Sequence, residues 1–201
     1  MLQNRNAMIF LSASVPTPER EYFGTENIFA IREAIVSFTK VCAEYSIPFY
    51  FGGHPAITPL IWEVAMRNTQ KAMSLIKIYQ SKIFGESIPK EVGDFKNVNF
   101  TEAVGNSIKE SVHAMREQMF RKNKTECAVF IGGMNGIIEE YKMLNELYPD
   151  AKYYAFASTG GASYDLYKEI GKPNPLLEGS YAYMSIFREI LSPFRQQQKE
   201  G

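Results

Sequence analysis

Short apolar runs alternate along this chain with longer segments in which apolar residues recur at helical spacing. Runs of this kind are typical of buried strands, and several end at glycine, serine or proline. The predicted strands are residues 7–11, 47–51, 75–79, 98–101, 127–131 and 153–157.

Helical periodicity fills most of the segments between these runs. Asn27 is placed to cap a helix in which Ile28, Ile31, Ile35 and Phe38 share one face. Further helices are expected after Pro55, from residue 108 into a basic cluster at 121–124, at about 135–147 and at 181–191. Residues 81–96 are the least regular and are expected to form a surface loop.

Strands that alternate with helices favour an α/β fold, here a Rossmann-like three-layer sandwich with a mostly parallel central sheet. A chain of 201 residues without a shift in composition is expected to form a single domain over residues 1–201.

Small or polar turns follow the ends of four predicted strands. In a parallel sheet these ends meet at one edge, where ligands of open α/β sheets bind. The turns are residues 12–14, 52–54, 132–133 and 158–161. A rim lined by all of them indicates a ligand site more strongly than any single glycine turn does.

The segment 129–140, VFIGGMNGIIEE, is the most informative of these strand ends. Glycines allow the backbone to approach a ligand, and a helix start offers unpaired N–H groups to a phosphate. Glu139 and Glu140 lie about 100° apart on the helix, so only one of them can face the rim squarely. Acids at this place can also simply complement the helix dipole. The turn fits neither the dinucleotide fingerprint nor the Walker A pattern.

These residues resemble the phosphate-binding turn of the Lonely-Guy and DprA-like superfamily, called SLOG. The Lonely-Guy motif P-G-G-x-G-T-x-x-E places Gly132 at the proline, Met134 at the second glycine, Ile137 at the threonine and Glu140 at the acid. On this alignment Glu140 is preferred to Glu139 as the functional acid. Arg116, in MREQM, is similar to a basic residue that Lonely-Guy enzymes carry on the preceding helix.

The segments IFLSASVPTPER and GGHPAITPLI resemble bacterial SLOG-domain proteins of defence and nucleotide-signalling systems. The resemblance covers roughly residues 8–160. It implies a Rossmann-like fold and a nucleotide-derived ligand, such as an ADP-ribose-like molecule or a nucleoside monophosphate. It does not by itself imply catalysis.

Two functions follow from this resemblance. The first is binding, as a sensor, of the nucleotide-derived molecule. The alternative is a Lonely-Guy-like phosphoribohydrolase that cleaves the N-glycosidic bond of a nucleoside 5′-monophosphate, with Glu140 and Arg116 as catalytic residues. Met134 and Ile137 replace a glycine and a threonine of the motif, which favours the sensor.

The candidate ligand-binding residues combine the four turns with the basic and acidic side chains of the motif. His54 is a candidate for a hydrogen bond to phosphate or ribose, although a histidine that packs within its turn explains its position nearly as well. The full set is Ser12, Ala13, Ser14, Gly52, Gly53, His54, Arg116, Gly132, Gly133, Met134, Asn135, Gly136, Glu140, Ser158 and Thr159.

Charge and composition limit the classes of binding partner that we expect. The formal net charge is zero and the isoelectric point is near 6.8, so neither a nucleic acid polymer nor a membrane is an expected partner. The N-terminal segment has no signal-peptide pattern, and the two cysteines share no metal-binding spacing. We therefore expect a cytoplasmic protein without a metal site or other cofactor. The apolar stretch 181–194 suggests a homo-oligomer, a dimer or higher, and a sensor would also need a separate effector protein.

Overall fold

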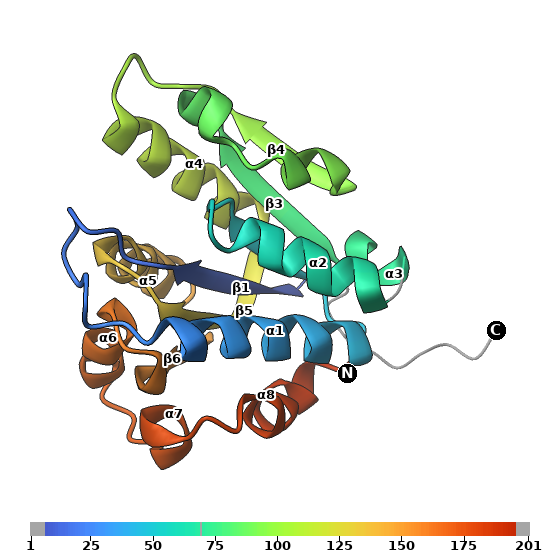
Figure 1. The fold of residues 1–201 in the computed structure, drawn as a ribbon, viewed down its shortest axis with the longest axis vertical. Coiled ribbons are helices and arrows are strands. Elements are labelled where there is room, and N and C mark those ends of the chain that lie inside the picture. Colours follow the sequence, from blue (N-terminus) through green and yellow to red (C-terminus); the bar gives the residue numbers. More distant parts are fainter. Residues whose placement is uncertain (1–6, 69, 196–201) are drawn as a thin grey trace.

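A six-stranded parallel sheet forms the centre of the molecule in the computed structural model, which describes residues 7–68 and 70–195 (Figure 1). The strands lie in the order β4-β3-β2-β1-β5-β6. They are β1 (Ala7–Ser14), β2 (Phe49–Gly52), β3 (Ile76–Ser81), β4 (Asn97–Thr101), β5 (Lys124–Gly132) and β6 (Lys152–Phe156). The predicted α/β, Rossmann-like sandwich is confirmed, and every strand pair is parallel.

Helices cover both faces of the sheet. One face carries α1 (Ile28–Glu44), α2 (Thr58–Asn68), α3 (Gln70–Ser74), α7 (Pro175–Gly179) and α8 (Tyr183–Leu191). The other face carries α4 (Ile108–Lys122), α5 (Asn135–Leu147) and α6 (Ala162–Ile170). In Figure 1, α1 and α2 lie in front of the sheet and α4 and α5 lie behind it. Short 3-10 helices occupy Lys82–Ser87, Lys90–Asp94, Ala157–Thr159 and Ser192–Phe194.

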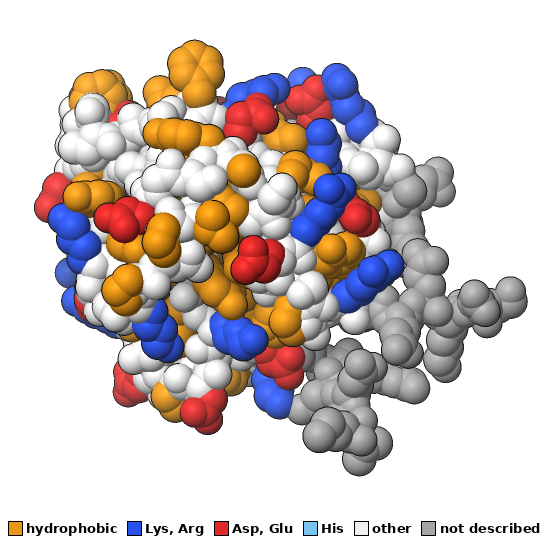
Figure 2. Space-filling model, turned by 90° about the horizontal axis from the view of Figure 1, so that it is seen from below, with side chains coloured by type: hydrophobic (Ala, Val, Ile, Leu, Met, Phe, Trp, Pro, Cys, Tyr) orange, Lys and Arg blue, Asp and Glu red, His pale blue; other side chains and the backbone are white. Residues whose placement is uncertain are grey.

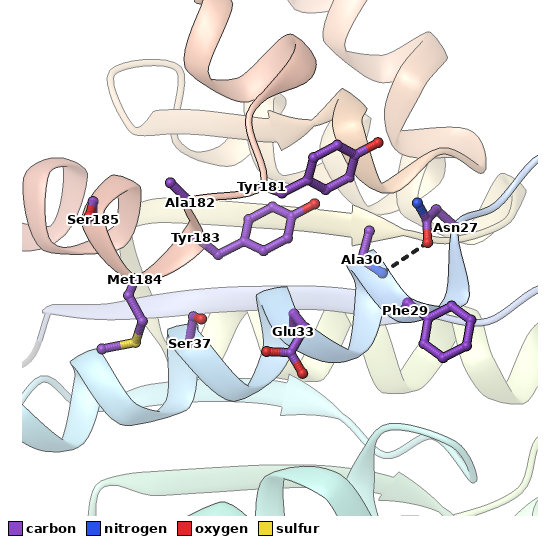
Figure 3. Close-up of a pocket in the computed structure, with 10 residues that line it drawn as sticks. All are labelled: Asn27, Phe29, Ala30, Glu33, Ser37, Tyr181, Ala182, Tyr183, Met184 and Ser185. Atoms are coloured by element: carbon purple, nitrogen blue, oxygen red, sulfur yellow. Dashed lines mark hydrogen bonds between the residues drawn. The ribbon is translucent and has the colours of Figure 1, made fainter.

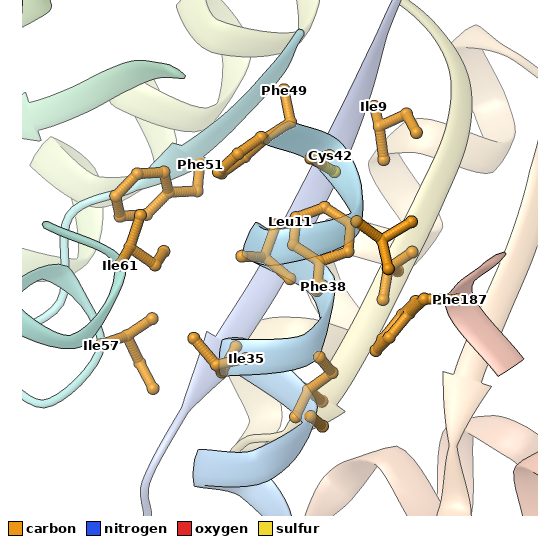
Figure 4. Packing of buried hydrophobic residues seen from close by; sticks show 14 of the residues in the cluster. Ile9, Leu11, Ile35, Phe38, Cys42, Phe49, Phe51, Ile57, Ile61 and Phe187 are labelled. Carbon is orange, nitrogen blue, oxygen red and sulfur yellow. The ribbon is translucent and has the colours of Figure 1, made fainter. Parts of the chain in front are cut away.

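Aromatic side chains fill the larger of the two cores. Phe38 of α1 packs edge-on against Phe49 of β2 and Phe187 of α8, with ring centroids 5.0 and 5.5 Å apart (Figure 4). Burial of aromatic rings contributes a large share of core stability, and the edge-on geometry adds to it. This core fixes α1 and α8 on the sheet beside β1.

The structure places the predicted elements with small shifts at their ends. Asn27 caps α1, because its side-chain oxygen accepts a hydrogen bond from the Ala30 N–H at 3.0 Å. The predicted helix at 135–147 is found with the same bounds. Ile28 was expected on the buried face of its helix, but it is 55% exposed, because it occupies the first position of α1 and the core begins at Ala30.

Some elements differ from the prediction. Residues 81–96, expected as a surface loop, contain two 3-10 helices and bury Val92 and Phe95 in the core. The short helices α3, α6 and α7 were not predicted. The last helix begins at Tyr183, so Tyr181 lies outside it and is 62% exposed. None of the helices in the described part of the chain is long and apolar enough to cross a membrane.

The order of the strands produces a switch point between β1 and β5. From β1 the chain moves outward through β2, β3 and β4, then returns to place β5 on the other side of β1. The turns after β2, β1, β5 and β6 therefore follow neighbouring strands at the carboxyl edge of the sheet. The predicted shared rim is confirmed, and its centre coincides with the place where open α/β sheets hold ligands.

Candidate functional site at the carboxyl edge of the sheet

The turn between β5 and α5 is built from two glycines in left-handed conformations. Gly132 has φ +61° and Gly133 has φ +88°, values that side-chain-bearing residues rarely adopt. The Gly133 N–H donates to the Ser14 carbonyl at 2.9 Å. This bond joins the turn after β5 to the end of β1, so two of the predicted ligand-binding segments meet at the switch point.

A side-chain cluster stands beside this turn. Arg116 on α4 donates through Nε to Glu140 Oε1 on α5 at 3.0 Å, and Ser12 on β1 donates through its hydroxyl to Glu140 Oε2. The side chains of Arg116 and Glu140 are only 12% and 13% exposed. Strands and helices distant in sequence thus bring together three of the predicted site residues, and both oxygens of Glu140 are held in place.

Gly136 makes room for the arginine of this cluster. A Cβ at Gly136 would lie 2.5 Å from Arg116 Nη2, so the guanidinium lies against the first turn of α5. The glycine of the motif at this position therefore has a structural purpose apart from any ligand.

Glu139 and Glu140 occupy different environments. Glu139 accepts a bond from Arg116 Nη1 at 2.6 Å, but its side chain is 60% exposed. Glu140 lies against the sheet and contacts the end of β1 through Ser12. The preference for Glu140 as the functional acid remains a prediction, and the geometry places it closer to the switch point than Glu139.

The turn after β6 is hydrogen-bonded to the glycine turn. Thr159 is fully buried, and its hydroxyl accepts the Gly132 N–H at 2.8 Å and donates to the Phe156 carbonyl at 2.6 Å. The Ser158 hydroxyl lies 3.0 Å from the Tyr183 hydroxyl. Both residues are predicted ligand contacts, yet the polar group of Thr159 is already engaged in holding the rim.

The first turn of α5 is crossed by the loop that follows β1. The Asn135 side chain donates to Glu21 of that loop. Met134, at the N-cap position, forms no side-chain cap. Ile137 is 3% exposed and packs beneath Gly133, where a Cβ would lie 2.6 Å from its Cγ2. Ile137 therefore fills the space under the turn, while Met134 is the half-buried residue at the turn itself.

The turn after β2 contributes a neutral histidine. His54 Nδ1 accepts the Ala56 N–H at 3.2 Å, and the His54 N–H donates to the Thr58 hydroxyl at 3.0 Å. Burial lowers the pKa of His54 from 6.5 to about 4, because the protonated ring loses its hydration. His54 is therefore uncharged at neutral pH, and a ligand would meet it as a hydrogen-bonding group rather than as a cation.

Comparison with known families decides the identity of this fold. The model of the SLOG cluster3 family matches residues 21–191. The chain belongs to the SLOG cluster3 family. Comparison with curated proteins gives no match.

The match to the SLOG cluster3 family covers most of the rim. It includes the turns after β2, β5 and β6 and the helix that carries Arg116, whereas Ser12–Ser14 lie before its first residue. Membership of this superfamily indicates nucleotide-related binding or processing. The geometry of Ser12 shows that the end of β1 nevertheless belongs to the same cluster.

Two polar residues at the rim, Gln80 and Glu26, were not predicted from the sequence. Gln80 near the end of β3 is 2% exposed, and its Oε1 lies against Gly53, where a Cβ would be only 2.0 Å away. Glu26 bridges to Gly160 in the turn after β6. One side-chain oxygen of each is buried without a hydrogen-bond partner among the described residues. A polar residue near the end of an apolar strand was a signal for Gln80, but Glu26 lies in a loop that no sequence pattern positions.

A separate groove of about 360 Å³ runs between α1 and the start of α8 in this SLOG cluster3 fold (Figure 3). Glu33 and Ser37 line the groove from α1, and the exposed rings of Phe29 and Tyr181 also border it. Viewed from below, hydrophobic side chains on the surface are interspersed with both charges (Figure 2). The groove contains none of the predicted site residues, so it is distinct from the rim at the switch point.

Proposed function

We propose that this chain binds a nucleotide-derived small molecule at the carboxyl edge of the sheet, between β1 and β5. The observation that supports this most strongly is the Ser12–Glu140–Arg116 cluster beside the Gly132–Gly133 turn. This cluster joins polar side chains from β1, α4 and α5 at the switch point. Packing of the hydrophobic core does not by itself call for polar side chains at this place.

The chemistry of the site suits a ribose joined to a phosphate. The uncapped start of α5, directly after the glycine turn, offers backbone N–H groups to a phosphate. The Gly132 and Gly133 N–H groups are already bonded to Thr159 and Ser14 and hold the turn in place. Glu140, one turn further along α5, is a carboxylate acceptor suited to ribose hydroxyls. An ADP-ribose-like molecule or a nucleoside monophosphate combines these two groups at short separation.

We favour sensing over turnover. Both oxygens of Glu140 are engaged by Arg116 and Ser12, an arrangement that fixes an acceptor for hydroxyl groups. Met134 stands where the Lonely-Guy motif has a glycine, which reduces access to the backbone of the turn. In this proposal the chain signals nucleotide levels in a bacterial defence or signalling system, through a separate effector protein.

Isothermal titration calorimetry with ADP-ribose and a panel of nucleoside monophosphates tests this proposal. We expect one of these ligands to bind, and Glu140→Gln to weaken that binding at least tenfold by removing a charged acceptor, worth about 1.5–3 kcal/mol. The matched control is Glu139→Gln, which removes the exposed acid of the same arginine and is expected to change the affinity much less. Absence of binding across the panel, or a larger effect at Glu139, would refute the proposed site.

The second candidate is hydrolysis of the N-glycosidic bond of a nucleoside 5′-monophosphate. The partly buried Glu140, oriented by Arg116, favours it, because a fixed carboxylate can stabilise an oxocarbenium-like transition state. Chromatography of nucleotide mixtures after incubation with the protein separates the two functions. Release of free base that is lost in both Glu140→Gln and Arg116→Ala would establish the hydrolase, whereas binding without release supports the sensor.

A further inference from the structure

Strand β4 lies at one edge of the sheet. Among the described residues it pairs only with β3, over the full register from Lys77–Asn97 to Ser81–Thr101, and this register has no bulge. Its residues Asn97 and Phe100 are exposed, the latter by 49%. Edge strands are commonly protected by a proline, a bulge or an internal charge, and β4 has none of these within its bounds.

The opposite edge of the sheet, β6, packs more extensively against the rest of the fold than β4 does. Helices α6 and α7 pack against β6. Its first residue, Lys152, is a charge at the edge, and Tyr153, Ala155 and Phe156 are buried. The two edges also differ in charge, because β6 begins with Lys152 whereas β4 carries no charged residue within its bounds.

The residues in and around β4 would pair favourably with the same residues of a second copy in antiparallel orientation. In an antiparallel register centred on Asn99, Lys96 faces Glu102 of the second strand, and Val98 faces Phe100. Asn97 faces Thr101 in the same register. Opposite charges therefore meet at both ends, and apolar residues meet between them.

The two faces of β4 support this pairing. Val98 packs on the face of the sheet that holds Ile78, its neighbour in β3. Asn99 is paired with Tyr79 and thus points to the α4 face. Lys96 is exposed and forms no ion pair within the part of the chain that is described, so its charge is free to meet a partner.

We propose that two copies of this chain associate by antiparallel pairing of their β4 strands, joining their sheets into one continuous sheet. The charge complementarity of Lys96 with Glu102 of the second copy sets the register. The exposed apolar residues that follow β4, Val104 and Ile108, extend the same end of the molecule and enlarge the surface available to the contact. A five-residue strand alone is short of the roughly 1,600 Å² of a standard interface, so this addition matters.

Sedimentation velocity over a concentration series tests the proposal with charge reversals. We expect the unmodified chain to dimerise, and Lys96→Glu and Glu102→Lys each to weaken the dimer about tenfold, since each turns two symmetric attractions into repulsions. The double variant, Lys96→Glu with Glu102→Lys, restores both attractions and is expected to return the dissociation constant to within about threefold of the original value.

Two control variants separate the interface from other effects. Lys82 forms an ion pair with Glu102 in the same chain, so Lys82→Ala shows what the loss of that pair alone does. Lys172→Glu reverses an exposed charge after α6, on the other side of the sheet. Both controls are expected to leave the dimer intact.

Hydrogen–deuterium exchange of the unmodified chain provides a readout that requires no variant. The amides of residues 97–101 are expected to become protected as the protein concentration rises through the dissociation constant. A chain that stays monomeric at about 100 μM, far above the micromolar affinities of weak dimers, would overturn the proposal. A dimer without protection at β4, or without rescue by the double variant, would equally overturn it.

Discussion

Arg116 reaches its two acid partners across Gly136, which has no side chain to obstruct the guanidinium. The position of Arg116 therefore depends on the missing side chain of Gly136 as well as on the two acids. At the scale of single residues, the candidate site depends on glycines that leave space for neighbouring side chains. Gly132 is another example, because a Cβ there would lie 2.4 Å from Ile31 Cδ1.

Gly136→Ala is expected to separate stability from ligand binding. Alanine is favoured over glycine in a helix by about 0.5–1 kcal/mol, which offsets the cost of disturbing the Arg116–Glu140 ion pair, so the free energy of unfolding should change little. The new methyl group would displace Arg116 from Glu140, and ligand affinity in calorimetry should fall. Gly179→Ala, where no atom lies within 4 Å of the added Cβ, is the matched control and should leave affinity unchanged. Equal affinity in Gly136→Ala would show that the position of Arg116 does not matter.

His54 is expected to make the fold sensitive to acid. Its pKa is about 4 in the folded chain and near 6.5 when unfolded, so the unfolded state binds more protons between these values. The free energy of unfolding should therefore fall as the pH drops from 6.5 to 4, by up to roughly 3 kcal/mol. Urea denaturation across this range measures it.

The only other histidine supplies the control for this acid effect. His113 is exposed on α4, so His113→Gln should preserve the pH dependence, whereas His54→Gln should reduce its slope. Identical slopes in the two variants would show that His54 is not buried as a neutral group.

At the scale of elements, the turns after β1, β5 and β6 form one interlocked unit. Gly132 and Gly133 bond to Thr159 and Ser14, and the Ala162 N–H donates back to the Gly133 carbonyl at 3.0 Å. The Asn27 N–H at the start of α1 donates to the Thr159 carbonyl at 3.0 Å. A change in any one of these turns is thus expected to reach the others.

Thr159→Val tests this interlocking. Valine keeps the shape of threonine but removes the acceptor of the buried Gly132 N–H, which should cost about 1–3 kcal/mol in the free energy of unfolding. Thr159→Ser keeps the hydroxyl and loses one methyl group, so its cost should be near 1 kcal/mol. Urea denaturation compares the two. If valine were tolerated as well as serine, the hydroxyl would not be holding the turn.

The strands and the longer helices could be predicted from sequence because each carries its own local signal. Asn27 marks the start of α1, and the alternation of strands and helices implies the shared rim. The short helix α6 was missed because only Ala162, Ser163 and Leu166 of its nine residues are buried, too few apolar positions to give a helical pattern, although Gly171 in a left-handed conformation marks its end. The burial of Phe95 was missed because it depends on tertiary packing against β2 and not on any local pattern.

Some contacts of the candidate site could be predicted from the sequence, and others could not. The resemblance to SLOG proteins pointed to Glu140 and Arg116, which the fold brings together. Their link to Ser12, and the buried amide of Gln80 against Gly53, arise from strands far apart in the chain. Such contacts depend on the order of strands in the sheet, which periodicity does not encode.

At the scale of the whole molecule, the order of strands separates two surfaces with different properties. The switch point between β1 and β5 lies inside the sheet and gathers the polar cluster, while β4 lies at the free edge. A ligand at the switch point and a second copy of the chain at β4 would therefore not compete for the same residues. The groove between α1 and α8 is a third surface and holds none of the predicted site residues, although Asn27 and Tyr183, which line it, are bonded to Thr159 and Ser158 of the turn after β6.

The crystal structure of this chain with its tightest-binding nucleotide tests the central claim most directly. We predict that the ligand lies over the end of β1 and the Gly132–Gly136 turn, with a ribose hydroxyl donating to Glu140. A nucleotide found in the groove between α1 and α8, with the Ser12–Glu140–Arg116 cluster untouched, would contradict the account.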